Sequence, residues 1–192
     1  MLKKILVIDN YDSFTYNILQ IIRENDYRYE MVKNDKITDK IIKEFDKILI
    51  TPGPGVPKNS GKIMNVIQKY SDKKSILGIC LGHQAIAETF GGKLKRLSQI
   101  RHGYKIKIKI LEKNDYLFRG LPSEIDAGLY NSWVVDKKSL PLCLSITSES
   151  TDGLIMGIAH REYDIRGIQF HPESVMTRLG GIIIKNWLDH PL

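Results

Sequence analysis

One cysteine stands in a sequence context that is typical of a covalent catalyst. Residues 78–82 read Gly-Ile-Cys-Leu-Gly, which is the glycine spacing of the GxSxG nucleophile elbow with sulfur in place of oxygen. The flanking glycines keep side chains away from Cys80, and a helix that begins just after it favours the thiolate with its positive end. We interpret Cys80 as a nucleophile, although a lone cysteine at a strand end is more often a small buried hydrophobe.

A thiolate that makes and breaks an acyl bond needs a group that moves protons, and the sequence offers one pair. In His171-Pro172-Glu173 the proline biases His171 toward an extended backbone, so the side chains of His171 and Glu173 point to the same side. Glu173 can then orient the imidazole as the third member of a triad. The alternative is a surface turn with an ion-paired glutamate.

The other histidines and the second cysteine have contexts that indicate structural roles. His83 lies on the helix after the nucleophile, where we expect capping or packing. We expect His160 on the surface of a strand and His190 near a frayed chain end. Cys143 has only apolar neighbours and is predicted to lie in the core.

A stiff loop of glycines and prolines, residues 51–57, stands between a predicted strand and a predicted helix. Prolines fix the loop, and glycines permit close backbone approach to a ligand. We therefore expect the amide of Gly55, together with that of Leu81 after the nucleophile, to form an oxyanion hole. A plain stiff turn is the alternative. The loop lacks the GxxxxGK[ST] spacing of a phosphate-binding loop.

The elements that would position these groups alternate between strands and helices in the first half of the chain. Periodicity predicts strands at 4–9, 28–33, 47–51 and 75–79, and helices at 13–22 (capped by Ser13), 39–44, 61–70 and 83–90, the last closed by Gly91-Gly92. Further strands are predicted at 105–111, 124–129, 141–148, 154–160 and 165–170, before a helix at 182–188. The sequence predicts an α/β fold: a single domain over residues 1–192 with a doubly wound, mainly parallel sheet, flanking helices and additional strands in the C-terminal half.

Composition excludes several classes of protein. The net charge of +7 comes from scattered lysines, and Lys105, Lys107 and Lys109 alternate with isoleucines as on the wet face of a strand, so we expect no nucleic-acid partner. No apolar run approaches the roughly 18 residues that span a membrane. Two cysteines are too few for a disulfide framework and lack metal-ligand spacing, so we expect no metal and a cytoplasmic location.

Four segments together resemble class I glutamine amidotransferase domains of the Cys-His-Glu triad type. They cover residues 9–17 (DNYDSFTYN), 52–55 (PGPG), 78–86 (GICLGHQAI) and 167–174 (GIQFHPES), so the likeness extends along nearly the whole chain. Within that family the segments are similar to the glutaminase subunits of anthranilate synthase and of aminodeoxychorismate synthase.

The resemblance implies a role for each matching position. Cys80 would attack the carboxamide of glutamine and form a glutamyl thioester, with the Gly55 and Leu81 amides stabilising the oxyanion. His171, oriented by Glu173, would protonate the departing ammonia and then activate water. The remaining glutamine contacts would come from Gly53, Pro54, Gly55, Gln84, Ser132 and Trp133.

The resemblance also implies a partner. Nothing in the chain resembles a chorismate site, so ammonia would pass to a separate chorismate-binding synthase subunit, whose family uses Mg²⁺; no cofactor is expected on this chain. The loop from Tyr11 to Thr15 is a candidate interface, with a packed helix cap as the alternative. At Asn131 relatives usually have histidine, and we expect this change to be mild.

Several functions remain open from the sequence. The leading prediction is ammonia supply for anthranilate in tryptophan biosynthesis. The same chemistry for aminodeoxychorismate and folate, or one chain shared by both, is the nearest alternative. The elbow alone is also compatible with a cysteine hydrolase of peptides or esters. A non-catalytic binding module is disfavoured because both Cys80 and His171 are present.

Overall fold

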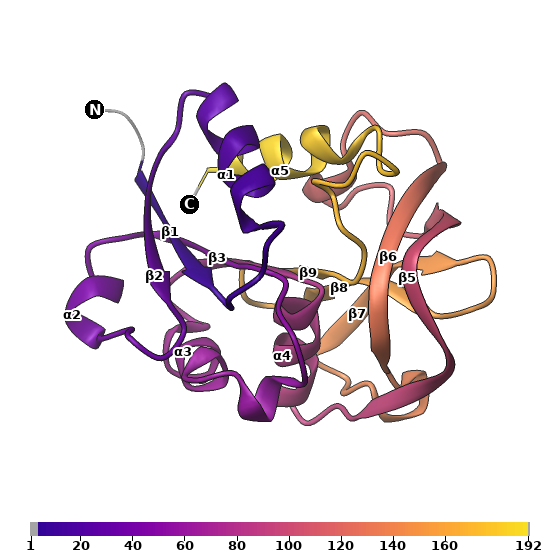
Figure 1. The fold of residues 1–192 in the computed structure, drawn as a ribbon, viewed down its shortest axis with the longest axis horizontal. Helices are drawn as coiled ribbons and strands as arrows, with labels where there is room; N and C mark the ends of the chain where they lie inside the picture. The colour runs from indigo at the N-terminus through magenta and orange to yellow at the C-terminus, as the bar shows by residue number, and fades with distance from the viewer. Residues whose placement is uncertain (1–3, 192) are drawn as a thin grey trace.

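The computed structural model describes residues 4–191, and the strands in that range form one mixed nine-stranded sheet (Figure 1). The spatial order is β2-β1-β3-β4-β9-β8-β7-β5-β6. The parallel half contains β1 (Lys4–Asp9), β2 (Arg28–Lys33), β3 (Lys47–Ile50), β4 (Ser75–Ile79) and β9 (Ile165–Ile168). The antiparallel half contains β5 (Leu94–Ile110), β6 (Glu124–Val135), β7 (Leu144–Ser150) and β8 (Ile155–His160).

Helices cover both faces of the parallel half because its strands are apolar on both sides. On β1, Ile5 and Val7 pack into one core cluster with α1 (Thr15–Glu24) and α5 (Gly180–Asp189). Leu6 and Ile8 face the opposite cluster, which we call the lower core cluster, with α2 (Asp39–Ile42), α3 (Ile63–Tyr70) and α4 (Leu81–Thr89). Short 3₁₀ turns lie at η1 (Pro57–Asn59), η2 (Tyr116–Phe118) and η3 (Lys137–Ser139). The predicted doubly wound α/β architecture is confirmed.

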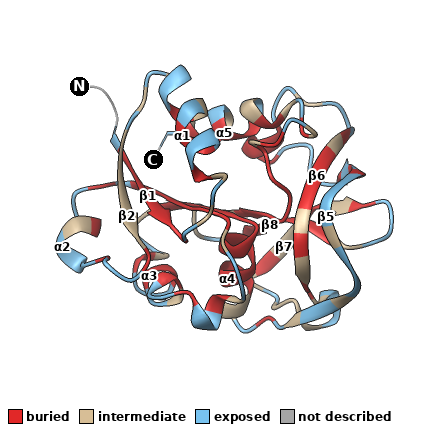
Figure 2. Ribbon diagram, in the orientation of Figure 1, coloured by how far each residue is buried: buried red, intermediate tan, exposed pale blue. Residues whose placement is uncertain are grey.

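The second half of the chain departs from the expected boundaries. Within residues 4–191, four of the eight strand pairings are antiparallel, so the sheet is evenly mixed rather than mainly parallel. β5 begins at Leu94, eleven residues before the predicted start, because pairing with β6 rather than burial makes residues 94–104 a strand. Figure 2 shows this stretch largely exposed, which is why hydrophobic periodicity missed it. Lys105, Lys107 and Lys109 face solvent between buried isoleucines, as predicted.

Two local predictions were wrong. Ser13 does not cap α1; Phe14 occupies the N-cap position, and its backbone N–H donates to the Asp12 carboxylate at 2.7 Å. His160 is not on the surface. Its ring is buried between Phe90 and Tyr163, and its Nδ1 accepts the backbone N–H of Tyr163 at 3.0 Å. The His160 ring therefore packs between two aromatic rings at the end of β8.

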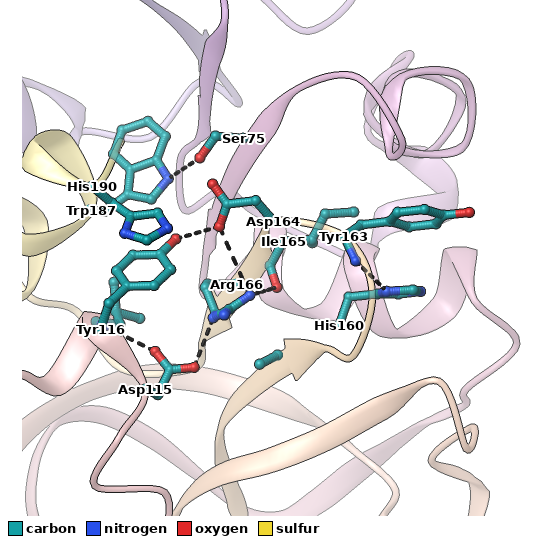
Figure 3. Close-up of polar contacts among 12 residues, drawn as sticks. Ser75, Asp115, Tyr116, His160, Tyr163, Asp164, Ile165, Arg166, Trp187 and His190 are labelled. Atoms are coloured by element: carbon teal, nitrogen blue, oxygen red, sulfur yellow. Dashed lines mark hydrogen bonds and ion pairs between the residues drawn. The ribbon is translucent and has the colours of Figure 1, made fainter. Parts of the chain in front are cut away.

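A polar cluster fastens the C-terminal helix to the amino ends of the central strands (Figure 3). Arg166 of β9 pairs with Asp115 at 2.7 Å, and the Tyr116 hydroxyl donates to Asp164 at 2.7 Å. Trp187 of α5 donates to the Ser75 hydroxyl at 3.1 Å. His190 stacks flat on Tyr116, with ring centroids 3.6 Å apart. The residue expected at a frayed end is therefore anchored. Cys143 is half-buried and packs against the lower core cluster.

The polar cluster around Arg166 predicts an effect on the stability of the fold that does not involve the predicted nucleophile Cys80. Replacing Arg166 with leucine leaves the Asp115 carboxylate, whose side chain is only 3% exposed, without its ion-pair partner. We expect the free energy of unfolding to fall by about 3 kcal/mol, measured by urea denaturation. The exposed pair between Lys4 and Glu30 provides the control, because Lys4→Leu is expected to cost under ~1 kcal/mol. Equal losses in the two variants would contradict the prediction.

Candidate active site

Cys80 occupies a sharp turn between β4 and α4. Its backbone has φ +52° and ψ −97°, a conformation that non-glycine residues rarely adopt. The turn is held on both sides, since the Cys80 N–H donates to the Ile168 carbonyl at 2.8 Å and the Cys80 carbonyl accepts the Gln84 N–H at 3.1 Å. Strain of this kind persists only where the surroundings impose it, and it is common at functional sites.

The two glycines of the elbow are required by close contacts. A Cβ on Gly78 would lie 2.4 Å from the backbone of Gly82, and a Cβ on Gly82 would lie 2.6 Å from the Ile50 carbonyl. Both clashes are with backbone, which cannot move aside as a flexible side chain can. The glycine spacing that indicated a nucleophile therefore lets α4 start directly against β3 and β4.

We expect Gly82→Ala to lower the free energy of unfolding by about 3 kcal/mol, because the new methyl group must displace the Ile50 backbone. Gly181 is the matched control: it lies in α5, and a Cβ there would meet nothing within 4 Å. Gly181→Ala is expected to be neutral or slightly stabilising, by up to ~1 kcal/mol. Thermal or urea unfolding of both variants checks the difference, and an unaffected Gly82→Ala would be inconsistent with this packing.

His171 follows β9 and is tied to its neighbours through its backbone. Its N–H donates to the Gly128 carbonyl of β6 at 3.0 Å, and its own carbonyl accepts the Thr177 hydroxyl at 2.7 Å. The His171 Nδ1 lies 2.7 Å from Glu173 Oε1, with 2% and 0% of the two side chains exposed. The structure thus brings the two predicted residues together in the interior, and the surface-turn alternative does not hold.

The electrostatics of His171 favour its protonated form. Burial opposes the charge on the imidazole, but the interactions with Cys80 and Glu173 outweigh it and raise the pKa of His171 to about 10. The other ring nitrogen, Nε2, makes no hydrogen bond within the described residues. His83, by contrast, is wholly buried on α4, and burial lowers its pKa to about 4, in agreement with a packing role. At neutral pH His171 is the charged imidazole of the two.

A pocket of about 510 Å³ joins the predicted residues. Cys80 and His171 line it, and Glu173 lies behind His171. The remaining predicted site residues also line it: Gly53, Pro54, Gly55, Leu81, Gln84, Ser132 and Trp133. The sequence therefore identified groups from four separate segments that meet in one cavity.

The glycine- and proline-rich loop, residues 51–57, packs closely against the elbow. A Cβ on Gly53 would lie 2.5 Å from the Cβ of Asn10 and 2.7 Å from the Leu81 side chain. Gly55 has φ +78°, which favours glycine. Within residues 4–191 the amides of Gly55 and Leu81 donate to no other group. Both residues line the pocket that Cys80 lines, so two unengaged backbone donors are present there, as an oxyanion hole requires.

A row of amide groups runs from β6 to the nucleophile. Gln84 Nε2 donates to the Trp133 carbonyl at 2.8 Å and to Gln169 Oε1 at 3.1 Å. Gln169 Nε2 in turn donates to the Cys80 sulfur at 3.5 Å. The sequence reasoning missed Gln169. Its only signal was an uncharged polar residue inside the predicted strand 165–170, two positions before His171. The structure buries this residue completely.

Asn131, the position that departs from the family pattern, belongs to the same row. Its Nδ2 donates to the Trp133 carbonyl at 3.0 Å. That carbonyl therefore accepts two N–H groups, one from Asn131 and one from Gln84, and both of its lone pairs are used.

The described part of the chain holds neither a cluster of metal-ligating side chains nor a membrane-spanning helix. Among residues 4–191, no group of three or more His, Cys, Asp or Glu side chains is arranged to hold a metal ion. Within the same range, every helix is too short or too polar to cross a membrane.

Residues 6–190 match the family model described as glutamine amidotransferase class-I. The chain belongs to this family. Anthranilate synthase component 2 of Pyropia yezoensis is 42% identical to this amidotransferase, over 97% of this chain and 99% of the relative. Aminodeoxychorismate synthase component 2 of Escherichia coli is 41% identical, over 96% of this chain and 98% of the relative.

A solved structure supports the assignment of the fold. A crystal structure from Thermoplasma acidophilum, described as a candidate GMP synthase component, superposes on this amidotransferase with a TM-score of 0.87 and 27% sequence identity. The superposition covers 98% of this chain and 93% of the other. The predicted fold class and the family resemblance are both confirmed.

Proposed function

We propose that this amidotransferase hydrolyses glutamine at Cys80 and passes the ammonia to a chorismate-binding synthase subunit that makes anthranilate, a step of tryptophan biosynthesis. The observation that carries the proposal is the strained Cys80 elbow in one pocket with the buried His171–Glu173 pair. The relatives named as component 2 of anthranilate synthase support the partner and the pathway.

The geometry supports a two-step acyl transfer. The Cys80 thiolate bonds to the carboxamide carbon of glutamine, and the oxyanion accepts the Gly55 and Leu81 N–H groups. His171 gives its Nε2 proton to the departing nitrogen, so ammonia leaves and a glutamyl thioester remains. The neutral His171 then takes a proton from water, whose oxygen attacks the thioester. Glutamate leaves, and Cys80 returns as the thiolate.

The amino-acid end of glutamine would meet the wall formed by Gln84 and β6. The NH₂ of Gln84 is engaged twice, so its Oε1 is the atom free to accept from the substrate's ammonium group. The Trp133 carbonyl already accepts two hydrogen bonds, so the Ser132 carbonyl is the better candidate acceptor on this wall, and Trp133 would contact glutamine through its N–H. Pro54 has no backbone N–H to donate to the substrate. Gly53, which lacks a Cβ, lets the loop approach Leu81 of the elbow closely.

The synthase would dock beside the pocket mouth. Tyr11, Tyr16 and Ile100 are 55%, 62% and 66% exposed, and Tyr11 and Ile100 also line the pocket. Large exposed apolar side chains grouped at a site mark an interaction surface. Phe14, in the same loop as Tyr11, packs edge-on against His171 at 5.8 Å. A partner that moves this loop would therefore change the surroundings of the catalytic imidazole.

An electrophilic glutamine analogue tests the chemistry. A diazoketone in place of the carboxamide is expected to alkylate Cys80 alone, and peptide mass spectrometry locates the adduct. Cys143, half-buried and outside the pocket, serves as the internal control. Labelling that glutamine does not slow, or labelling at Cys143, would contradict the assignment. A hydrolase of peptides or esters would instead turn over acyl substrates without a partner.

The pathway is tested with the synthases themselves. We expect glutamine-dependent anthranilate formation from chorismate when the chain is mixed with its cognate anthranilate synthase component. The Escherichia coli relative makes aminodeoxychorismate synthase the second candidate partner. Activity with that component alone would transfer the function to folate biosynthesis, and activity with both would indicate that the two synthases share this chain.

We also propose that this chain needs no cofactor of its own, because the groups that carry the chemistry are protein side chains and amides, and that the Mg²⁺ belongs to the synthase. A cytoplasmic location is part of the proposal, since the mechanism requires Cys80 to remain a free thiol and both cysteines are free. Chelation of Mg²⁺ is expected to stop anthranilate formation and to leave glutamine hydrolysis unchanged.

A further inference from the structure

Gln169 is a fully buried amide whose donor group points at the nucleophile. It follows β9 directly, is 0% exposed, and its own N–H is fixed by the Met156 carbonyl of β8 at 2.9 Å. Its Nε2 lies 3.5 Å from the Cys80 sulfur. An apolar side chain of the same size would fill this space without the cost of burying an amide, so the polar group needs an explanation.

The hydrogen-bond row fixes which end of the amide faces the sulfur. The Trp133 carbonyl can only accept, so Gln84 must turn its NH₂ toward it. The same NH₂ gives its second hydrogen to Gln169, whose oxygen must therefore face Gln84. That leaves the NH₂ of Gln169 directed at Cys80. The orientation of the Gln169 amide is therefore set by the Trp133 carbonyl on β6, which acts through Gln84.

We propose that Gln169 is a positioning residue for Cys80, which holds the sulfur in place and stabilises its thiolate form. The inference rests on the proposed role of Cys80 as the nucleophile and deepens it. A hydrogen bond to an ionised partner is stronger than one to a neutral partner, so the Gln169 donor favours S⁻ over SH. It assists twice: it stabilises the thiolate that attacks, and it stabilises the thiolate that leaves when the thioester is hydrolysed.

The arrangement gives Gln169 a role that neither triad partner fills. His171 is the proton donor and must turn toward the departing nitrogen, so it cannot hold the sulfur throughout the reaction. Gln169 cannot titrate and is locked by Gln84 and the β8 backbone. The sulfur therefore keeps one fixed donor while His171 changes its protonation state.

The pH dependence of Cys80 alkylation tests the proposal in the full chain. Gln169→Met keeps the length and volume of the side chain and removes the donor. We expect the midpoint of iodoacetamide alkylation, followed on the Cys80 peptide by mass spectrometry, to rise by about one pH unit, so that labelling below the wild-type midpoint slows roughly tenfold. Gln169→Glu, which puts a carboxylate beside the sulfur, is expected to shift the midpoint further in the same direction.

A second variant separates this effect from a loss of packing. Ser75→Ala removes a buried hydrogen bond at the opposite end of β4 and does not touch Cys80, so its alkylation profile should match the wild type. If both Gln169 variants keep the wild-type midpoint, the amide is only a packing group and the proposal is overturned. The readout is independent of glutamine turnover, so a failure of the proposed glutaminase would appear as wild-type-like hydrolysis by Cys80→Ala instead.

Discussion

Cys80→Ala is expected to abolish anthranilate formation from glutamine while formation from added ammonium continues at the wild-type rate. The alanine removes the only sulfur among the described residues that line the pocket, so neither the thioester nor the ammonia it releases can form. Loss of a nucleophile that acts with a base typically costs at least about 10³-fold in turnover. The expected ratio of glutamine-dependent to ammonium-dependent rate therefore falls by at least about 10³-fold.

The ammonium arm makes this result interpretable. If Cys80→Ala misfolded or failed to dock, the complex would be damaged for both nitrogen sources or would not assemble. Cys143→Ala is the matched control, because that thiol is half-buried in the lower core and outside the pocket. It should leave both rates unchanged. Full glutamine-dependent activity of Cys80→Ala with the synthase would remove Cys80 from the mechanism.

The sequence predicted the parallel half of the fold well because its signals there are local. Strands β1, β3 and β4 are short apolar runs between turns, and the elbow glycines signal a strand-to-helix turn at Cys80. In the structure those glycines are required by backbone contacts only 2.4 to 2.6 Å from an added Cβ. A motif that close backbone contacts require can be recognised from the sequence alone.

The antiparallel half was predicted less accurately because its boundaries depend on distant partners. The first half of β5 is largely exposed, and only its pairing with β6 makes it a strand. Gln169 was missed for a related reason. Its significance lies in contacts with Gln84 and Cys80, which are 85 and 89 positions away in the chain. No periodicity or short motif signals a hydrogen bond over such a separation.

His160 and His190 show the same limit from the opposite direction. Neither has an aromatic residue directly beside it in the sequence, yet the fold buries His160 between Phe90 and Tyr163 and stacks His190 on Tyr116. His171 was identified because its orienting partner is only two residues away. Local pairs can be read from the sequence, whereas a ring whose partners come from other elements needs the structure.

Glu173→Gln is expected to lower glutamine turnover by about 10³-fold with little change in the shape of the pocket. The side chain keeps its length and can still hydrogen-bond His171 Nδ1, so the ring keeps its position. The variant removes the negative charge that, together with Cys80, raises the pKa of His171 to about 10 against the burial of the ring. With that charge gone, burial of the ring lowers the pKa of His171. Fewer molecules then hold the proton that ammonia needs to depart.

The same change alters how stability depends on pH. His171 has a pKa near 6.5 when unfolded and about 10 when folded, so its charge contributes stability that is fully present below pH 6.5 and is lost as the pH rises through about 10. In Glu173→Gln the folded pKa of His171 falls, so the loss of unfolding free energy between pH 6.5 and 10 becomes smaller. Urea denaturation at several pH values measures this slope directly.

The Glu30→Gln variant is the matched control for both measurements. Glu30 forms an exposed pair with Lys4, so its replacement should change neither turnover nor the pH slope beyond about 0.5 kcal/mol. Because Glu173 and His171 are buried together, activity and pH slope must change together in Glu173→Gln. A variant that kept its turnover within about threefold while losing the slope would show that the ion pair serves folding alone and that another group protonates ammonia.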